Sequence, residues 1–388
     1  MTTYDVVVVG AGITGASTAY HLKKRGVGRV LLVDREVPAA GGTGKSAAIM
    51  RQHYSNPLLV RLSKSSIGML AALPQEIGKS GGYVRDGYFF ILNEEMMAGA
   101  KANVAMQRDV GVDTRFLASG EIESLCPWLN RDGVAAVIHE PDGGYADPVQ
   151  STEAYVHGFS ALGGEFREKA PVRALLRSGD RITGVAFDAE EVDAGSVVNA
   201  AGPWAGSLAA TAGIELSMRT VREQDTIWEA RAGRPVPTGS VSNGVDAIYL
   251  RTLTERRFVI GRGFPKEYHD VDPYNYKLTA DDSFIADVQT RMERRFPPLA
   301  GARLVSAYAA LYDVALDWYP YAGARAGLGG YFDASGGSGH GFKIGPAIGR
   351  ELADWIVDER TSADFARLSY DRVAQGALFT QAYGGNRG

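Results

Sequence analysis

The first 34 residues combine an apolar run, three spaced glycines and an acidic residue, and no other feature constrains the fold as strongly. Residues 4–9 predict a strand, and Gly10, Gly12 and Gly15 predict a tight turn that opens a helix to about Arg25. A second apolar strand follows at residues 29–33 and ends at Asp34. The pattern predicts a βαβ unit of about 30 residues.

The spacing of these glycines is the spacing that binds a dinucleotide. The first glycine allows the turn, the second lets a pyrophosphate approach the backbone, and the third lets helix pack on strand. The helix N-terminus then offers free N–H groups and the positive end of its dipole. Asp34 would bind the adenosine ribose hydroxyls and disfavour NADP, although Arg35 beside it weakens that exclusion. The motif alone leaves FAD, NAD and a purely structural glycine turn as alternatives.

The composition excludes several classes of protein. The chain has 388 residues, enough for two domains, and 48 glycines, a share above the usual ~7%. The glycines follow no three-residue period and lie among aliphatic residues, which excludes collagen and argues against low-complexity disorder. The 41 Lys and Arg residues are interspersed with 45 Asp and Glu residues, so no nucleic-acid-binding footprint is expected.

Cysteine, histidine and apolar runs limit the remaining possibilities. Cys126 is the single cysteine, which excludes an internal disulfide. No metal is expected, because metal-ligand spacing is absent among the six histidines, which are His21, His53, His139, His157, His269 and His340. No apolar run approaches the ~20 residues that span a bilayer. These features predict a cytoplasmic protein without a membrane partner.

Four motifs in a fixed order carry a resemblance to a known family. They are VVVVGAGITGASTAYHL from residue 6, GTGKSAAIMRQHYS from residue 42, VVNAAGPWAG from residue 197 and GGSGHGFKIGPAIG from residue 336. Together they resemble the D-amino acid oxidase superfamily of FAD-dependent enzymes, and within it the sarcosine oxidase and glycine oxidase branch. The resemblance covers both ends and the middle of the chain, and it implies FAD as the cofactor.

The expected fold is α/β combined with α+β, with a Rossmann-like FAD-binding domain and a discontinuous antiparallel-sheet substrate domain. The FAD-binding domain is expected from residues 1–80, 141–220 and 320–388, and the substrate domain from 81–140 and 221–319. Residues 81–93 and 224–263 are rich in β-branched and aromatic residues, typical of antiparallel ribbons. Helices are expected at 279–296 and at about 346–359, and residues 384–388 are expected to fray.

The cofactor residues follow from the motifs and the resemblance. The helix after the terminal glycine-rich stretch is expected to aim its N-terminus at the flavin pyrimidine, where it would stabilise the negative charge of the reduced ring. The residues expected around FAD are Gly10, Gly12, Ile13, Thr14, Gly15, Asp34, Arg35, Thr43, Lys45, Ser46, Ala47, Val172, Ala201, Gly202, Trp204, Gly337, Gly339, His340, Gly341, Phe342 and Lys343.

The resemblance also implies the substrate-binding residues. Arg51 and Lys343 would bind the substrate carboxylate, and the planar fork of a guanidinium suits that task. Tyr308 lies where the family has an active-site tyrosine, and Tyr249 is a second candidate. His53 is as readily structural as catalytic. The plain alternatives are a surface ion pair for Arg51, a solvated lysine at 343 and aromatic packing for the tyrosines.

Two departures from the family pattern bear on the flavin. Ser306 stands where monomeric sarcosine oxidases have the cysteine bonded to the flavin, and the loop at residues 42–46 lacks the histidine that attaches it in heterotetrameric relatives. Non-covalent FAD is therefore expected. By our alignment Val259 replaces the lysine that promotes O2 reduction in sarcosine oxidases, although glycine oxidases use oxygen without it.

The expected reaction is oxidation of the C–N bond of a small or N-substituted amino acid, by hydride transfer to flavin N5 and hydrolysis of the imine. Glycine, a sarcosine-like amine or a larger secondary amine with an N-carboxymethyl group would fit, with O2 favoured over another electron acceptor. Three alternatives share some of the motifs: a 2-hydroxy acid or polyol-phosphate dehydrogenase, the flavin subunit of an electron-transfer complex, and an NAD-linked dehydrogenase. The oligomeric state is not indicated.

Overall fold

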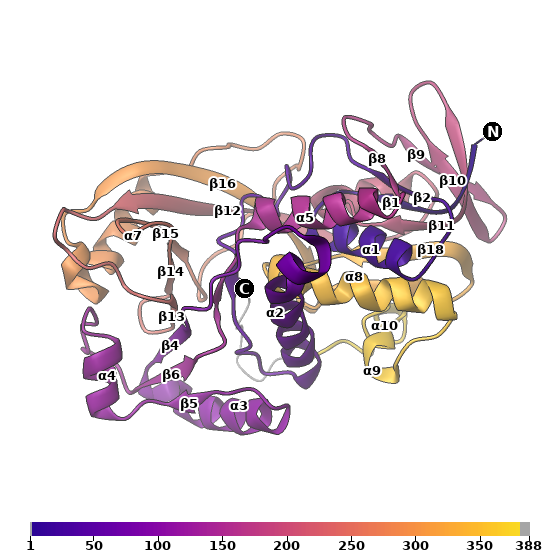
Figure 1. Cartoon of the computed structure of the whole chain (residues 1–388). Helices are drawn as coiled ribbons and strands as arrows, with labels where there is room; N and C mark the ends of the chain where they lie inside the picture. The colour runs from indigo at the N-terminus through magenta and orange to yellow at the C-terminus, as the bar shows by residue number, and fades with distance from the viewer. Residues whose placement is uncertain (1, 381–388) are drawn as a thin grey trace.

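The chain forms two eight-stranded sheets, in a computed structural model that describes residues 2–380. Figure 1 shows them in two halves of an elongated molecule, with α1, α5 and α8 beside the sheet that contains β1. The expected combination of a Rossmann-like layer with an antiparallel-sheet layer is confirmed. The expected frayed tail at 384–388 lies outside the described residues.

The first sheet has a parallel centre. Strand β1 (Thr2–Val9) pairs in parallel with β2 (Val30–Val33) on one side and with β11 (Glu191–Asn199) on the other. The sheet is completed by β8 (Glu165–Arg167), β9 (Ala174–Ser178), β10 (Arg181–Ala186), β17 (Tyr321–Arg325) and β18 (Leu328–Ser335). Its strands come from three separated parts of the chain, and β18 also lies parallel to β11.

Strand β1 shows why this sheet is buried on both faces. Val6 and Val8 point into a core formed with helices α1 (Ile13–Lys24), α2 (Pro57–Ile77), α5 (Pro148–Ala161) and α8 (Gly341–Asp358). Val7 and Val9 point into a second core on the other face, where α6 (Ala205–Ala210) packs. Alternate side chains of a strand point to opposite faces, so a continuous valine run fits a sheet covered on both sides.

Helices α1 and α8 pack closely against each other at two glycines. A Cβ on Gly345 would lie 2.8 Å from Cγ2 of Ile13, and a Cβ on Gly349 would lie 2.6 Å from the backbone nitrogen of Thr18. The Ser17 hydroxyl donates to the Pro346 carbonyl at 2.8 Å across the same contact. The two glycines, four residues apart on one helix face, therefore let the backbones meet and place both helix N-termini near each other.

Helix α8 begins at Gly341 and not near Pro346, where the sequence predicts it to begin. The prediction treated the proline as the first helical residue and the glycines before it as loop. Pro346 is the sixth residue of the helix, where it removes one backbone hydrogen bond to the carbonyl of Phe342. Contact with α1 at Gly345 and Gly349 offsets that loss and the low helix propensity of the glycines.

The second sheet is antiparallel except for one parallel pair. Its order is β16 (Arg303–Ala315), β12 (Met218–Glu229), β15 (Arg257–Arg262), β14 (Ile248–Thr252), β13 (Ser240–Asn243), β4 (Tyr88–Leu92), β6 (Ala136–Glu140) and β5 (Arg115–Phe116), and β13 runs parallel to β4. Helix α7 (Asp282–Arg295) covers one face, burying Val288 and Met292 in the core. The predicted apolar stripe of this helix is confirmed, although Phe284 at its start is only partly buried.

The remaining elements are short or peripheral. A small two-stranded sheet pairs β3 (Ile49–Met50) with β7 (Gly144–Tyr145). The other helices are α3 (Met97–Asp109), α4 (Ser119–Leu125), α9 (Ala363–Ala366) and α10 (Asp371–Ala374), with single 3-10 turns at Glu94–Met96, Gly202–Trp204 and Pro297–Leu299. The second sheet draws its strands from two segments between those of the first, and the exact domain boundaries remain a prediction.

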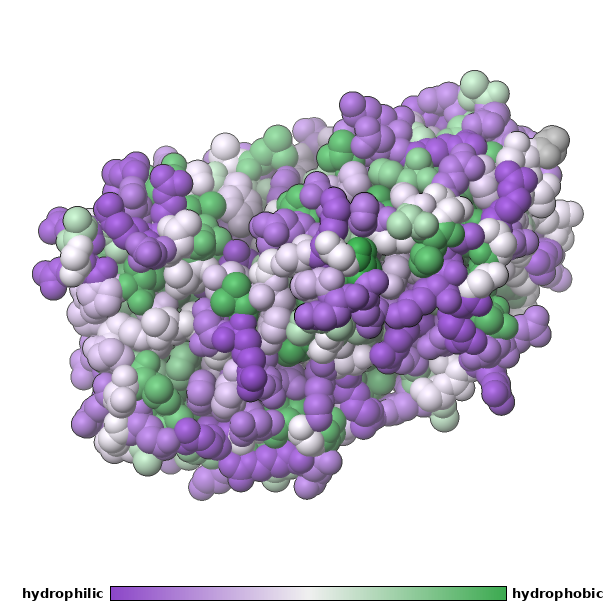
Figure 2. All heavy atoms as spheres, viewed as in Figure 1, coloured by the Kyte–Doolittle hydropathy of each residue, from purple (hydrophilic) through white to green (hydrophobic). Residues whose placement is uncertain are grey.

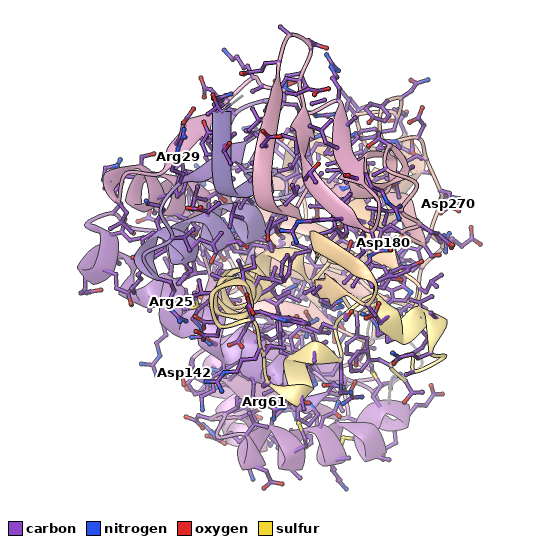
Figure 3. The ribbon with its side chains drawn as sticks, turned by 90° about the vertical axis from the view of Figure 1, so that its right-hand side faces the viewer. Arg25, Arg29, Arg61, Asp142, Asp180 and Asp270 are labelled. Carbon is purple, nitrogen blue, oxygen red and sulfur yellow. The ribbon has the colours of Figure 1, made fainter. Side chains whose placement is uncertain are left out.

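The exposed surface is largely polar, and many of its charged side chains form ion pairs. Figure 3 labels Arg25 and Arg61, which project from the helical side of the molecule. Arg25 pairs with Asp354 and Asp358 of α8, and Arg61 pairs with Asp364 of α9. In Figure 2 apolar side chains on the visible face are scattered among polar ones. Within residues 2–380, no helix has the length and apolar character needed to cross a membrane.

Candidate functional site

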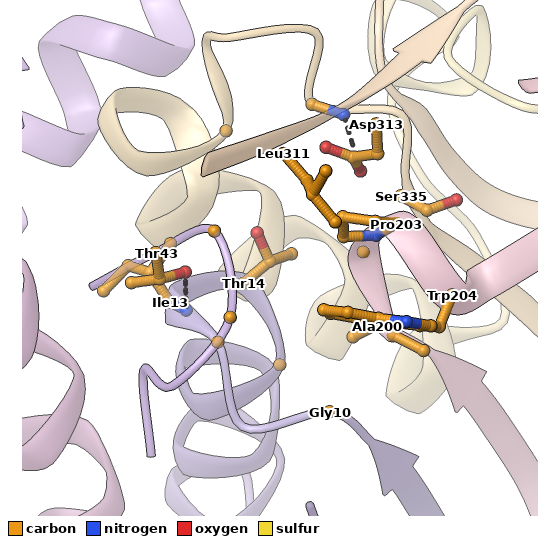
Figure 4. Close-up of a pocket in the computed structure, with 18 of the residues that line it drawn as sticks. Gly10, Ile13, Thr14, Thr43, Ala200, Pro203, Trp204, Leu311, Asp313 and Ser335 are labelled. Atoms are coloured by element: carbon orange, nitrogen blue, oxygen red, sulfur yellow. Dashed lines mark hydrogen bonds between the residues drawn. The ribbon is translucent and has the colours of Figure 1, made fainter. Parts of the chain in front are cut away.

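A cavity of about 450 Å³ opens between the two sheets. Its wall includes the turn after β1, the loop at residues 40–51, the turn after β11, strands β12 and β16, and the start of α8. Figure 4 shows side chains from these segments converging on it, among them Thr43, Trp204, Leu311 and Asp313. The cavity lies at the carboxyl ends of the parallel strands, where α/β sheets bind ligands.

One end of the cavity is formed by glycine backbone. Gly10 has a positive φ of 109°, and a Cβ there would lie 2.3 Å from the carbonyl oxygen of Ala200. Gly12 is the N-cap of α1 and provides no side-chain cap, so the helix N-terminus is open. The Ile13 N–H donates to Thr43 Oγ1 at 3.2 Å, which ties the second loop to this end (Figure 4). Such an end could hold a pyrophosphate.

Asp34 closes the same end of the cavity. Its carboxylate accepts the N–H groups of Ala11 at 2.7 Å and Glu36 at 2.8 Å, one on each oxygen. Burial raises the pKa of Asp34, and the two N–H donors oppose that rise. Each oxygen keeps a lone pair for a further donor, such as a ribose hydroxyl. Beside it the Arg35 guanidinium lies 3.8 Å from the centre of the Trp204 ring.

Two polar atoms in the cavity wall lack a partner within the described part of the chain. They are the indole N–H of Trp204 and the hydroxyl of Ser335, both buried. Figure 4 shows both residues beside Pro203 and Leu311. Buried polar atoms are almost always hydrogen-bonded, so their isolation indicates that a polar ligand completes this wall.

The start of α8 is held by a carboxylate from the other sheet. Asp313 of β16 accepts the N–H groups of Gly336 at 2.7 Å and Gly337 at 3.0 Å. Burial raises the pKa of Asp313, while these donors favour its charged form. The bonds fix the turn that leads into α8, whose N-cap residue His340 provides no side-chain cap. The open N-terminus of an 18-residue helix therefore faces the cavity and favours negative charge there.

Two basic side chains lie beside this helix N-terminus. Arg51 is 3% exposed, donates to the carbonyl of His53 and stacks with its Cζ 4.5 Å from the centre of the Tyr54 ring. Lys343 is 8% exposed, and its Nζ donates to the Gly339 carbonyl at 3.1 Å. Burial, together with the charge of Arg51, holds the pKa of Lys343 well below its ordinary value. The buried Glu140 carboxyl acts electrostatically on Arg51, but neither basic side chain forms an ion pair with a carboxylate among residues 2–380, so the pair could bind an anion.

The opposite wall of the cavity is acidic. Glu223 and Asp225 alternate along β12 and both face the cavity. Glu223 accepts from Lys266 Nζ at 2.5 Å, and Asp225 accepts from the Tyr249 hydroxyl at 2.6 Å. Burial raises the pKa of Asp225 to about 7, against the opposing effect of the Tyr249 hydrogen bond.

The structure brings most of the predicted residues to this cavity. Those that line it are Gly10, Gly12, Ile13, Thr14, Gly15, Asp34, Arg35, Thr43, Lys45, Ser46, Ala47, Arg51, Val172, Ala201, Gly202, Trp204, Tyr249, Gly337, Gly339, Gly341, Phe342 and Lys343. Their proximity agrees with the predicted roles, which stay predictions until binding is measured.

Three predicted residues do not line the cavity. His53 is fully buried behind Arg51, with its ring 4.6 Å from that of Phe90. Tyr308 turns its hydroxyl to the carbonyl of Lys45 at 3.3 Å. The ring of His340 bonds the Tyr54 hydroxyl at 3.2 Å. Each side chain is held by a protein contact, so a direct ligand contact from any of them is unsupported by the geometry.

The sequence motifs do not predict several polar residues of the wall, and four of these lie side by side in the second sheet, namely Glu223, Asp225, Tyr312 and Asp313. All lie on β12 or β16, in strands whose alternating pattern belongs to no motif. The only signal was the carboxylates at alternate positions 223 and 225, which place two acids on one face of a strand.

The predicted departures from the family pattern can also be located. The described residues that line the cavity include no cysteine and no histidine. Cys126 lies buried in the core of the second sheet, and Ser306 is exposed. Val259 is buried in β15, outside the cavity wall. Within residues 2–380 no three His, Cys, Asp or Glu side chains are grouped as metal ligands.

A family model described as FAD dependent oxidoreductase matches residues 5–355, and the chain belongs to this family. FAD is therefore its cofactor, as the sequence predicted. The glycine backbone at the end of β1, the open helix N-termini and the two unpartnered polar atoms of the wall fit such a group.

Individual relatives agree with the family assignment. The chain is 28% identical over 95% of its length to 4-methylaminobutanoate oxidase (formaldehyde-forming) from Paenarthrobacter nicotinovorans, of which it spans 45%. It is 26% identical over 97% of its length to sarcosine oxidase subunit beta from an Arthrobacter species, of which it covers 93%. The chain thus spans less than half of the first relative but nearly all of the second.

Solved structures confirm the fold. L-proline dehydrogenase from P. horikoshii superposes with a TM-score of 0.90 at 27% identity, over 97% of this chain and 100% of that one. Glycine oxidase from Geobacillus kaustophilus gives a TM-score of 0.82 at 22% identity, over 95% and 98% of the two chains.

Proposed function

We propose that the chain oxidises the C–N bond of a small or N-substituted amino acid, giving an imine that water hydrolyses. Glycine-like and sarcosine-like amines, and larger secondary amines with an N-carboxymethyl group, belong to this class. The observation that carries the proposal is the pair of buried cations, Arg51 and Lys343, which face the cavity without a carboxylate partner among residues 2–380. The names of the relatives, which refer to a methylaminobutanoate, sarcosine and proline, are consistent with an amine substrate.

The cofactor would lie along the cavity from Asp34 to the start of α8. Asp34 would accept the ribose hydroxyls, and the open end of α1 at Gly12 would face the pyrophosphate. Trp204 and Ser335 would donate their free hydrogens to it. When bound, FAD supplies the two-electron acceptor for the reaction.

The protein's own contribution is to bind and orient the substrate. A carboxylate between the Arg51 guanidinium and the Lys343 ammonium would be neutralised in a site that excludes most water, where a charged hydrogen bond is strong. The N-terminus of α8 adds to the same positive field. Fixing the carboxylate fixes the carbon beside it, so positioning would supply much of the rate.

The flavin is proposed to be non-covalent and to pass its electrons to O2. The first point is supported by the absence of cysteine and histidine from the described cavity wall. A chromophore that stays with acid-precipitated protein would contradict it. The second is tested by comparing peroxide formed with substrate consumed in air; substrate loss that requires an artificial dye would indicate a dehydrogenase.

The proposed reaction is tested by anaerobic bleaching of the flavin spectrum with a panel of amino and hydroxy acids. Bleaching by sarcosine, glycine or an N-substituted glycine, and not by lactate or glycerol 3-phosphate, is the expected result. In Arg51→Met the substrate concentration for half-maximal bleaching should rise ~100-fold or more while FAD stays bound, because one charged partner of the carboxylate is lost. The exposed Arg61→Met is the control.

A second candidate is a flavin-carrying subunit of a larger complex. It is favoured by the similarity to a protein named as a sarcosine oxidase subunit over nearly its whole length. Turnover by the isolated chain at the rate of flavin reduction would exclude this candidate. Reduction without turnover until another protein is added would support it.

A further inference from the structure

The acidic wall of the cavity holds one carboxylate that forms no ion pair within residues 2–380. Glu223 is neutralised by Lys266, whose Nζ lies 2.5 Å from its carboxylate. Asp225 has the Tyr249 hydroxyl as its hydrogen-bond donor and forms no ion pair with any described residue. It is 6% exposed. The nearby Lys266 favours the charge of Asp225 but is bonded to Glu223. A buried carboxylate without an ion-pair partner of its own is costly, so its retention here indicates a task.

The charge of this carboxylate is opposite to that of Arg51 and Lys343, which lie on the other wall of the cavity. Arg51 and Lys343 form no ion pair with a carboxylate among residues 2–380, Asp225 forms none with a cation there, and all three line the same cavity. Tyr312 lines the same cavity and interacts electrostatically with Arg51 and with Asp225. The separated charges are complementary to a ligand that carries both a carboxylate and an ammonium group.

We propose that Asp225, held by Tyr249, forms the subsite for the amino nitrogen of the substrate, where it binds the ammonium form and accepts its proton. This inference rests on the proposed amine oxidation and adds to it the residue that selects and prepares the nitrogen. It assigns to the chain a substrate that is zwitterionic on arrival, rather than a hydroxy acid.

The proton balance of this step is complete within the protein. An aliphatic ammonium with a pKa near that of lysine, about 10, arrives protonated at neutral pH. Its N–H bond breaks, the proton forms an O–H bond with Asp225, and the electron pair of the N–H bond becomes the lone pair of a neutral amine. The ammonium and the carboxylate are both neutralised, and no oxidant or further reactant takes part.

The surroundings of Asp225 suit a proton acceptor. The groups that face it are Tyr249 from β14, Tyr308 and Tyr312 from β16, Glu223 from its own strand, and Lys266 from the loop after β15. Burial raises the pKa of the free Asp225 carboxyl to about 7, closer to that of an amine than an exposed carboxyl would be. Proton transfer is most effective when the base has a pKa near the working pH.

The rival explanation is that the Asp225–Tyr249 bond only ties β12 to β14. A tie of this kind would affect stability and FAD content, and it would leave the ligand's charge and the pH dependence of flavin reduction unchanged. Both quantities can be measured on the holoenzyme.

The first measurement compares two ligands of nearly the same shape, glycine betaine and 3,3-dimethylbutanoate. Both carry the carboxylate, and they differ by a quaternary nitrogen in place of a carbon. Titrated against the flavin spectrum at pH 8.5, betaine is expected to bind about tenfold or more tightly to the native protein. In Asp225→Asn this preference should fall to within about twofold, while Asp270→Asn, on the outer surface, should keep it.

The second measurement is the pH dependence of anaerobic flavin reduction by the best substrate of the panel. The native rate should rise through an apparent pKa near 7 and level off. In Asp225→Asn the rate at pH 7 should fall about 100-fold and climb until pH 9 or above, because solvent must then remove the proton. Tyr249→Phe removes the hydrogen-bond donor that favours the charged form of Asp225. The rising part of its pH profile should therefore lie at higher pH than in the native protein.

The outcomes separate this inference from the proposed function. Equal binding of the two ligands, or an unchanged pH profile in Asp225→Asn, overturns the role of Asp225 even when sarcosine bleaches the flavin. If neither betaine nor 3,3-dimethylbutanoate perturbs the flavin spectrum, Arg51 and Lys343 do not bind a carboxylate. Dimethylammonium chloride then tests the acidic subsite alone. A perturbation by dimethylammonium that persists in Asp225→Asn would also overturn the inference.

Discussion

Asp225 and Tyr249 bond to each other across an intervening strand. Strand β15 separates β12 from β14, and it presents Gly261 in register with both residues. The Tyr249 hydroxyl reaches Asp225 Oδ1 at 2.6 Å because that glycine has no side chain. A Cβ on Gly261 would lie 2.3 Å from Asp225 Oδ1 and 2.4 Å from the hydroxyl of Tyr249. The geometry of the acidic wall therefore depends on Gly261, which leaves room for this hydrogen bond because it has no side chain.

Gly261→Ala should damage the acidic wall without removing the cofactor. The added methyl group displaces Asp225 or Tyr249, so the preference for betaine over 3,3-dimethylbutanoate should drop at least fivefold, with FAD content unchanged. Gly263→Ala is the matched control, because a Cβ there meets its nearest atom at 3.5 Å, an ordinary contact. If Gly261→Ala and Gly263→Ala lower the preference for betaine equally, the close contact of Gly261 with Asp225 and Tyr249 does not determine that preference.

Gly349→Ala should destabilise the contact between the two helices that face the cofactor. Its Cβ would lie 2.6 Å from a backbone atom of Thr18, which cannot move away without shifting α1. Overpacking of this kind costs roughly 1–3 kcal/mol in the free energy of unfolding, and the displaced α1 N-terminus should weaken FAD binding. Urea unfolding with FAD present and FAD titration of the apoprotein measure the two effects.

The control for this prediction is Gly68→Ala in α2. Gly68 is an exposed helical glycine with no atom within 4 Å of an added Cβ. The substitution should stabilise the protein by about 0.5–1 kcal/mol, since alanine loses less backbone entropy in a helix. A destabilised Gly68→Ala together with a neutral Gly349→Ala would contradict the packing argument.

Binding of a carboxylate should be accompanied by proton uptake at Lys343. Burial and the nearby Arg51 hold the pKa of Lys343 well below its ordinary value, and an adjacent anion raises it again. Calorimetric titration with 3,3-dimethylbutanoate in two buffers of different ionisation enthalpy should therefore show net proton uptake near pH 8. Lys343→Met should abolish the uptake, and native binding without uptake would refute the prediction.

The cofactor half of the site could be predicted because its chemistry is local in sequence. Gly10 to Gly15, Asp34 and the loop around Arg51 each lie in a contiguous motif, and backbone approach to a pyrophosphate demands glycine at set positions. The fold class followed from the same motifs together with the β-branched ribbons. The family, the fold class and the FAD cofactor are confirmed, while the roles of the substrate-binding residues remain predictions.

The acidic wall, apart from Tyr249, could not be predicted because it is assembled by strand register. Asp225, Gly261 and Tyr249 are brought into one row only by the pairing of three strands, and no short motif records that row. For Tyr308 and His340 the motifs predict a role at the site but cannot predict the rotamer. Their side chains turn to Lys45 and Tyr54, contacts between residues more than 250 positions apart.

Outside the site, the ion pair between Asp246 and Arg295 should govern acid stability of the second sheet. Both side chains are 1% exposed, and Asp246 also accepts from the Asn243 amide at 2.7 Å. Despite burial, Arg295 and Asn243 hold the pKa of Asp246 below its ordinary value of 3.8. A carboxyl whose folded pKa is lowered stabilises the fold above pH 3.8, and that contribution is lost as the pH falls through the folded pKa.

Asp246→Asn should therefore cost roughly 3–5 kcal/mol in the free energy of unfolding at pH 7, because it leaves Arg295 buried without a counter-charge. As the pH falls below 3.8, protonation removes the same charge from the native protein, so the difference between the two proteins should narrow. Urea midpoints from pH 7 to pH 3 measure it. Asp180→Asn, at a carboxylate 92% exposed, is the control and should stay within about 0.5 kcal/mol of the native protein. A difference independent of pH would assign the loss to packing rather than to charge.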